Sequence, residues 1–137
     1  MKNIKKVLFG KVLTVLLIVL FVPAVGFSEV SKTYYESGAL KSESTLKKGK
    51  REGPFKDYYE SGKLKSEYNF KNGKNEGPCK TYYESGAVQT EHTHKTGKKE
   101  GPSKEYYESG KLKKTGTFEN GQLINMKEYN EQGKLIK

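Results

Sequence analysis

Lysine and tyrosine stand two residues apart at five places in the chain, and this pairing is the arrangement best suited to bind a ligand. The pairs are Lys32 with Tyr34, Lys56 with Tyr58, Lys80 with Tyr82, Lys104 with Tyr106, and Lys127 with Tyr129. Residues two apart in a strand point to the same face, so the pairs would form a row. Its ammonium groups and aromatic rings could hold an extended anionic or sugar-bearing polymer by charge and ring stacking. The same lysines would also keep a thin sheet soluble and limit edge pairing, and both roles stay open.

A pair of histidines has the spacing of possible metal ligands. His92 and His94 would share one strand face, while Glu91 between them would point to the other. No further Cys or His lies near them in their own copy of the repeat described below. The equivalent positions in other copies hold Ser44 and Leu46, Tyr68 and Phe70, and Gly116 and Phe118. We therefore interpret both histidines as packing residues and predict neither a metal site nor a cofactor.

Cys79 is the single cysteine of the chain, so it cannot form an intrachain disulfide. Its equivalents in neighbouring copies are Phe55 and Ser103. A position that accepts such different side chains is typical of packing, and we interpret Cys79 as a structural residue. Intermolecular disulfide formation and redox reactivity are the alternatives.

The carboxylates recur with the repeat and offer no catalytic arrangement. Glu36, Glu60, Glu84 and Glu108 lie in one turn, and Glu52, Glu76 and Glu100 precede a Gly-Pro step. An active site needs a unique arrangement, whereas a residue present in every copy has a structural role first. The chain also lacks a nucleophile–His–acid set and a phosphate-binding glycine loop. We predict a protein without catalytic residues that is not an enzyme.

A block of 24 residues recurs along the chain. The sequence Y-Y-E-S-G starts at Tyr34, Tyr58, Tyr82 and Tyr106, and an eroded copy starts at Tyr129. A fixed period of this size is typical of an array in which one supersecondary unit stacks on its neighbours. Such arrays mostly present surfaces for binding.

Each unit predicts two strands and two turns. Residues 64–71 alternate apolar and polar, with Leu64, Ser66, Tyr68 and Phe70 on one face, as expected for a half-buried strand. Gly62 can adopt positive φ in the loop before this strand, and Asn72-Gly73 after it is a strong hairpin dipeptide. A Gly-Pro step at a strand start suits a bulge or an edge.

Five such units predict an all-β fold, an elongated antiparallel meander of repeated hairpins with about ten strands. The last unit has Leu123-Ile124-Asn125-Met126 where Glu-Gly-Pro is expected, as in the terminal cap of an array. In each Tyr-Tyr pair we expect the second ring to pack inward and the first to stand outside beside its lysine.

Residues 1–26 predict an export signal, and residues 27–137 the repeat domain. Four lysines precede an apolar run that ends at Pro23, and Ala24 and Gly26 suit a cut before Phe27. We expect a secreted, periplasmic or cell-surface protein, or a membrane-anchored one if the segment stays uncut. Without it the chain has 22 basic and 16 acidic residues, a net charge of +6 that favours anionic surfaces. The export signal argues against nucleic acid as a partner.

The repeat resembles a known family. Y-Y-E-S-G-K-L followed by F-K-N-G-K-x-E-G-P is similar to the bacterial variant of the MORN repeat, over residues 34 to about 136. The resemblance implies an array of β-hairpins and a role in protein scaffolding or lipid contact. One bacterial branch of the family is associated with antitoxins.

Three functions follow as expectations. The first is an exported, non-enzymatic protein whose sheet binds another protein or a cell-surface component. The second is a binder of anionic lipid or envelope polysaccharide through the Lys–Tyr row. The third, implied by the resemblance alone, is an antitoxin or immunity-like partner of a toxin.

Overall fold

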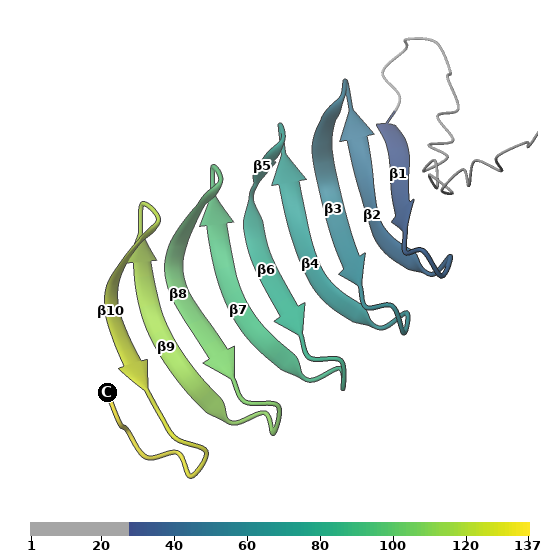
Figure 1. Cartoon of the computed structure of the whole chain (residues 1–137). Coiled ribbons are helices and arrows are strands. Elements are labelled where there is room, and N and C mark those ends of the chain that lie inside the picture. Colours follow the sequence, from purple (N-terminus) through teal and green to yellow (C-terminus); the bar gives the residue numbers. More distant parts are fainter. Residues whose placement is uncertain (1–27) are drawn as a thin grey trace, which may run out of the picture.

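The computed structural model describes residues 28–137, which form one antiparallel sheet whose strands follow one another in chain order (Figure 1). The strands are β1 (Ser28–Tyr34), β2 (Leu40–Lys47), β3 (Lys50–Tyr58), β4 (Leu64–Lys71), β5 (Lys74–Asn75), β6 (Gly77–Tyr82), β7 (Val88–Lys95), β8 (Lys98–Tyr106), β9 (Leu112–Glu119) and β10 (Gln122–Glu128). The short β5 and the following β6 both pair with β4. The predicted all-β meander of about ten strands is therefore confirmed.

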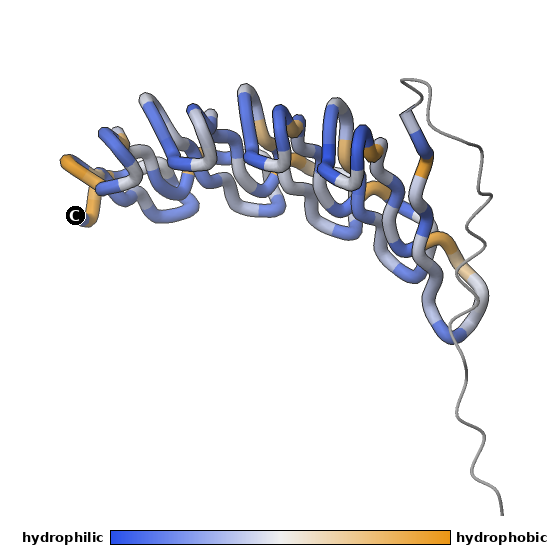
Figure 2. The backbone as a smooth tube through the Cα atoms, turned by 90° about the horizontal axis from the view of Figure 1, so that it is seen from above, coloured by the Kyte–Doolittle hydropathy of each residue, from blue (hydrophilic) through white to orange (hydrophobic). Residues whose placement is uncertain are grey.

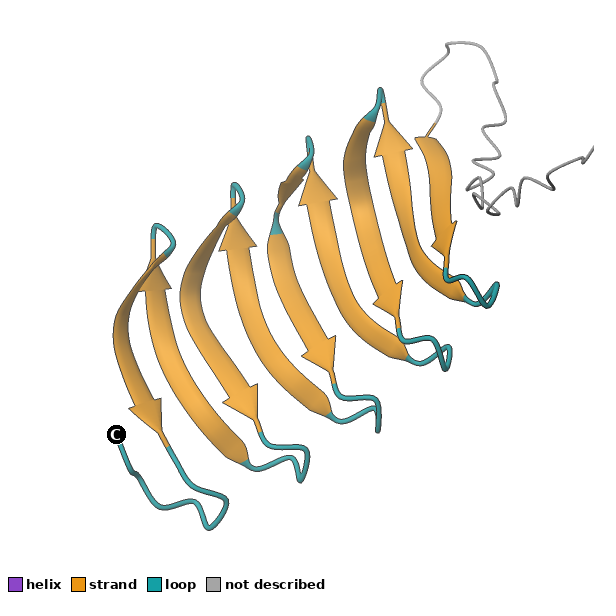
Figure 3. Cartoon of the chain, viewed as in Figure 1, coloured by secondary structure: helices purple, strands orange, loops and turns teal. Residues whose placement is uncertain are grey.

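The described residues contain no helix, and hence none that could cross a membrane (Figure 3). The predicted export signal at residues 1–26 lies outside the part of the chain that the structure describes. Seen from above, the array is a thin bowed slab, with hydrophobic residues in short stretches along its length and at both ends (Figure 2). No second layer covers either face in residues 28–137.

Tight turns join the two strands of each predicted hairpin at one long edge of the sheet. Asn72 and Gly73 have φ angles of 52° and 80°, so both lie in the left-handed region. Positive φ at two successive residues is the geometry of the type I′ turn, whose twist matches that of paired strands. The same pair of angles recurs at Lys48-Gly49, Thr96-Gly97 and Asn120-Gly121, which confirms the hairpin prediction.

The Tyr-Glu-Ser-Gly loops form the opposite edge. The Tyr59 N–H donates to the Lys63 carbonyl at 2.8 Å, and the Gly62 N–H donates to the Tyr59 carbonyl at 2.9 Å. Gly62 has a φ of 83°, as its position in the loop predicts. The register shifts just before each loop, because Asp57 pairs with Ser66 while Tyr58 pairs with Leu64.

The Gly-Pro step forms a bulge, but not always at a strand start. In β3, Gly53 has a φ of 81° and lies within the strand, whereas β6 begins at Gly77. Opposite this step, Ser44 pairs with Phe55 and Leu46 pairs with Arg51, so Thr45 has no partner in β3, although it pairs with Val30 in β1. The bulge tolerates Pro54 because its position needs no regular ladder bond.

The small core lies on one face of the sheet, along a line that we call the central column. It runs through Ser31, Ser44, Phe55, Tyr68, Cys79, His92, Ser103, Gly116 and Met126. Apart from glycine, the only buried residues in the described part of the chain are Phe55, Ser66 and Cys79, and all three lie on this face. The Phe55 ring packs against Tyr68 and Phe70 at centroid distances of 5.9 and 5.7 Å, an aromatic cluster that covers a thin sheet with few residues.

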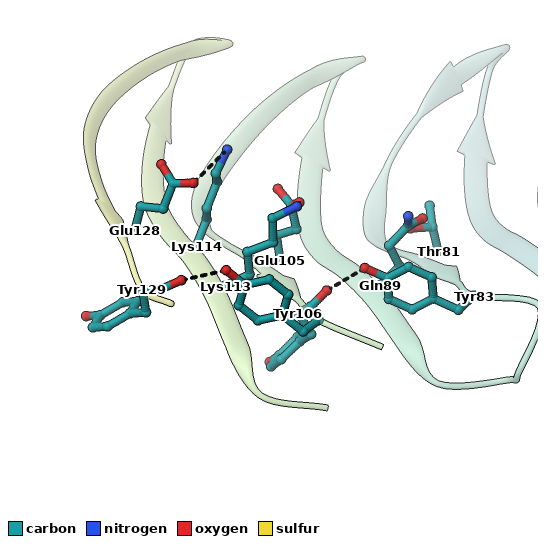
Figure 4. Close-up of polar contacts among 10 residues, drawn as sticks. Thr81, Tyr83, Gln89, Glu105, Tyr106, Lys113, Lys114, Glu128 and Tyr129 are labelled. Carbon is teal, nitrogen blue, oxygen red and sulfur yellow. Dashed lines mark hydrogen bonds and ion pairs between the residues drawn. The ribbon is translucent and has the colours of Figure 1, made fainter. Parts of the chain in front are cut away.

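Two side-chain hydrogen bonds connect each unit to the next. The second tyrosine of a pair donates to the backbone carbonyl of the first tyrosine one unit on, as Tyr83 does to Tyr106 at 2.8 Å (Figure 4). The same bond joins Tyr35 to Tyr58, Tyr59 to Tyr82, and Tyr107 to Tyr129. These half-buried tyrosines therefore span the boundary between units instead of simply packing inward.

The glutamate before Gly-Pro makes the second connection. Glu52 Oε2 accepts a hydrogen bond from the Asn72 backbone N–H at 2.7 Å, in the type I′ turn of the next unit. Glu76 and Glu100 accept equivalent bonds from Thr96 and Asn120. The structural role expected for these repeated carboxylates is to bind the turn of the next unit.

Removing one tyrosine hydroxyl tests the first connection. We expect Tyr83→Phe to lower the free energy of unfolding by about 0.5–1.5 kcal/mol, the net value of one hydrogen bond. Tyr34→Phe is the matched control, since Tyr34 is 58% exposed and its hydroxyl makes no hydrogen bond to the described residues. Urea unfolding measures both, and equal midpoints for the two variants would show that the bond contributes nothing.

Candidate functional site

The predicted Lys–Tyr row is interleaved with glutamates that the sequence analysis did not include. On the face opposite the central column, four of the five lysines, all except Lys127, lie across from an acidic residue on a neighbouring strand. Lys56, for example, pairs with Glu43 on one side and Glu67 on the other. Directly opposed residues in an antiparallel pair share a face and bring their side chains together.

This row of residues that lie opposite one another crosses the sheet from β1 to β10, and we call it the charge ladder. In spatial order it consists of Lys32, Glu43, Lys56, Glu67, Lys80, Glu91, Lys104, Thr115 and Lys127. Positive and negative side chains alternate along it up to Lys104. The row is therefore largely charge-balanced, and not the uniformly cationic surface expected from the lysines alone.

The first tyrosines of the pairs attach to the charge ladder through its carboxylates. The hydroxyl of Tyr58 donates to Glu43 at 2.7 Å, that of Tyr82 to Glu67 at 2.5 Å, and that of Tyr106 to Glu91 at 3.0 Å. Glu91 also forms an ion pair with Lys80 at 3.0 Å. These three tyrosines are half-buried. Of the five tyrosines in the predicted Lys–Tyr row, Tyr34 alone is exposed.

The alternation ends at Thr115. Lys104 pairs with Glu91 on one side but with Thr115 on the other, and Lys127 also pairs with Thr115. Both lysines are exposed. The C-terminal end of the charge ladder thus carries two lysines around a neutral side chain, and it is the most cationic part of the row.

The opposite face has a hollow in the fourth unit, where units are now counted as the strand pairs β1–β2, β3–β4, β6–β7 and β8–β9. Ser103 and Gly116 replace the large residues that fill the central column in the second unit, and they leave a volume of about 210 Å³. His92, Lys99, Phe118 and Met126 line it as well. Gly116 is required there, because a Cβ atom would lie 2.8 Å from the Asn125 carbonyl oxygen in β10.

The histidine pair has a third potential ligand beside it, which corrects the expectation that none lies nearby. Cys79 on β6 stands directly across from His92 on β7, and the ligand atoms of Cys79, His92 and His94 all lie within 4.8 Å of one another. Burial lowers the pKa of His92 to about 4 and raises that of Cys79 to about 11. A His92 ring at neutral pH therefore has a free lone pair.

Comparison of units at the 24-residue period could not find this contact, nor show that the glutamates of the charge ladder lie opposite the lysines. Both depend on the bulge before each loop, where Thr81 pairs with Thr90 but Tyr82 pairs with Val88. Without the one-residue shift, Cys79 would lie opposite Glu91 and every side chain would change face. The recurrence of Glu43, Glu67 and Glu91 one strand away from the lysines was the available signal.

The tyrosine hydroxyls that donate to the charge ladder should lose their protons at a higher pH than a free tyrosine does. Burial, reinforced by the neighbouring carboxylate, raises the pKa of Tyr58 and Tyr82 from 10.0 to about 12. Because folding raises these pKa values, their stabilising effect is complete below pH 10 and is lost as the pH rises through 12. Ultraviolet titration of tyrosinate should show a late-titrating group, and Glu67→Gln should move Tyr82 part of the way back towards 10.0. Unchanged titration of that variant would contradict the role of Glu67.

Comparisons with known proteins address the repeat itself. The model of the MORN repeat variant matches residues 30–48, 51–72, 75–96 and 99–120, more than half of the chain. A comparison with curated proteins finds no match.

Two solved structures match this chain at low identity. The crystal structure of TarM matches with a TM-score of 0.44 and 14% identity, over 77% of this chain and 20% of that one. The structure of accessory secretory protein 1, 2 and 3 in Streptococcus pneumoniae matches with a TM-score of 0.23 and 14% identity, over 77% of this chain and 16% of that one. The chain thus spans about a fifth or less of either structure. By its four matched repeats, the chain belongs to the MORN repeat variant family.

Proposed function

We propose that the chain is an exported, non-enzymatic repeat protein whose sheet binds a protein partner or another component of the cell surface through the charge ladder. The observation that carries this proposal is the alternation of lysine and glutamate across the sheet. A single-layer sheet leaves this face open to solvent over its whole width. Membership of a repeat family of binding proteins supports the same role.

The spacing of the charge ladder favours a protein partner over a polyanion. Strands lie roughly 4.8 Å apart, so like charges recur every 9–10 Å or so. A uniformly negative polymer laid across the ladder would meet Glu43, Glu67 and Glu91 as well as the lysines. A protein surface can place opposite charges against both signs, and such complementarity gives specificity more than raw affinity.

Anionic lipid or an acidic envelope polysaccharide is the second candidate. The observation that favours it is the interruption at Thr115, where Lys104 and Lys127 have no intervening acid. Binding of this kind would be confined to the C-terminal end of the sheet. It would also fall steeply with ionic strength, because exposed charges are screened by salt.

Export is tested by fractionating native cells and sequencing the N-terminus of the recovered protein. We expect recovery outside the cytoplasm with a cut near residue 26, because the N-terminal segment has the composition of a signal peptide. An uncut chain in the membrane fraction would instead indicate a membrane-anchored sheet. Recovery from the cytosol would contradict export and favour the antitoxin-like role.

The binding role is tested by replacing the lysines of the middle of the charge ladder together. We expect the Lys56→Gln, Lys80→Gln, Lys104→Gln variant to keep its strand content, because turns and tyrosine bonds stay intact. Its binding to an envelope fraction should weaken strongly. The matched control replaces Lys47, Lys71 and Lys95, which are exposed at strand ends away from the ladder.

Protease treatment and vesicles separate the two candidates. For a protein partner, proteolysis of the envelope fraction should abolish binding, and vesicles of anionic phospholipid should not bind. Binding that survives proteolysis, disappears at high salt and is reproduced by those vesicles would replace the protein partner with the lipid. Equal binding by the ladder variant and its control would contradict both candidates.

A further inference from the structure

Three potential metal ligands converge on the central column in the third unit. Cys79 and His92 oppose each other across β6 and β7, and His94 follows two residues later on the same face. Their ligand atoms lie within 4.8 Å of one another. The His92 and His94 rings contact each other edge to face at a centroid distance of 4.9 Å.

We propose that Cys79, His92 and His94 bind a transition metal ion of the zinc class. Atoms at the corners of a triangle with sides of 4.8 Å lie about 2.8 Å from its centre. Zinc requires about 2.3 Å to sulfur and 2.0–2.1 Å to nitrogen. Each ligand atom would therefore move by about half an ångström to an ångström, which side-chain rotation can supply without a change in the strands.

The donor set selects the kind of metal. One thiolate and two imidazoles are ligands for zinc and its chemical relatives, whereas magnesium and calcium prefer oxygen. Three protein ligands leave a fourth tetrahedral position for water or another donor. The hollow of about 210 Å³ lies next to the cluster, because His92 lines it.

Comparison with the neighbouring units argues against packing as the whole explanation. In the second unit the three equivalent positions hold Phe55, Tyr68 and Phe70, which pack as an aromatic cluster. In the fourth they hold Ser103, Gly116 and Phe118, none of which offers a strong zinc ligand. Of the described strand pairs, only β6–β7 carries sulfur and imidazole donors at all three positions, with Cys79 and the histidines contributed by successive copies of the sequence repeat.

Unpartnered polar atoms at the cluster are a second, independent observation. In residues 28–137, the buried side-chain atoms without a hydrogen-bond partner are His94 Nδ1 and Asn75 Oδ1. Such atoms are costly unless something binds them. Asn75 occupies the place of Arg51, whose guanidinium lies 4.6 Å from the Phe55 ring in the preceding unit. Asn75 pairs with Phe70 across β4 and β5, and its shorter side chain makes no such contact with a ring of the described residues.

Lys99 is the charged group that opposes a cation here. Its ammonium acts on Cys79, His92 and His94 alike, and it also lies 5.1 Å from the Phe118 ring. We therefore expect Lys99→Met to increase metal affinity by removing this repulsion. A structural role for Cys79 and the histidines predicts no such gain.

Cobalt(II) titration of the purified chain tests the site, because a cobalt–thiolate bond gives a charge-transfer absorption that surface imidazoles do not. We expect one equivalent to bind with this absorption, and zinc to displace it. The control variant Cys79→Phe, His92→Tyr, His94→Phe restores the aromatic cluster of the second unit. It should fold and lose the absorption.

Single replacements make the test independent of that triple variant. Cys79→Ser should abolish the thiolate absorption, and His94→Gln should weaken affinity by more than the roughly 10–100-fold that loss of an outer-shell partner costs. A folded, reduced chain that shows no cobalt–thiolate absorption would overturn the proposal. So would equal cobalt binding by the control variant, or no gain for Lys99→Met.

Discussion

The register of the strands is the constraint on which the rest of this molecule depends. A single-layer sheet has no opposing layer to hold its strands in place, so pairing and turns must do so alone. Type I′ turns at one edge and bulged Tyr-Glu-Ser-Gly loops at the other fix every pairing. Since a slip of one residue would exchange the two faces, both the charge ladder and the central column exist only because the register is exact along the array.

The connections between units explain how so little buried area suffices. Ordinary domains gain their stability from apolar burial, but only a few described side chains of this sheet are buried. Instead, each unit presents a tyrosine hydroxyl and a glutamate to the next, at opposite ends of the strands. Stability in such an array is a sum of nearest-neighbour terms. One unit can then change its face residues, as the third does, without altering the others.

Sequence reasoning could predict the elements but not all of the contacts between them. The strand alternation at residues 64–71, the positive φ of Gly62 and the Asn72-Gly73 turn follow from local chemistry, and all three are observed. The partnership of Cys79 with His92 depends on a bulge that skips a residue in the pairing. The Gly-Pro step signals one bulge in the sequence, whereas the shift between Thr81 and Tyr82 has no comparable Gly or Pro to mark it. The lysines and their glutamate partners both recur at the 24-residue period, but the period aligns copies of one position and does not show which positions lie opposite each other on neighbouring strands.

The two faces of the sheet differ in how repetition constrains them. On the charge ladder the chemistry is nearly the same in every unit, so a partner would read a regular surface, interrupted once at Thr115. On the central column each unit carries a different set of side chains at the same backbone positions: aromatic in the second, sulfur and imidazole in the third, small in the fourth. A repeat array can therefore combine an extended recognition surface with a single specialised position. The two need not interfere, because a pleated sheet directs successive residues to opposite sides.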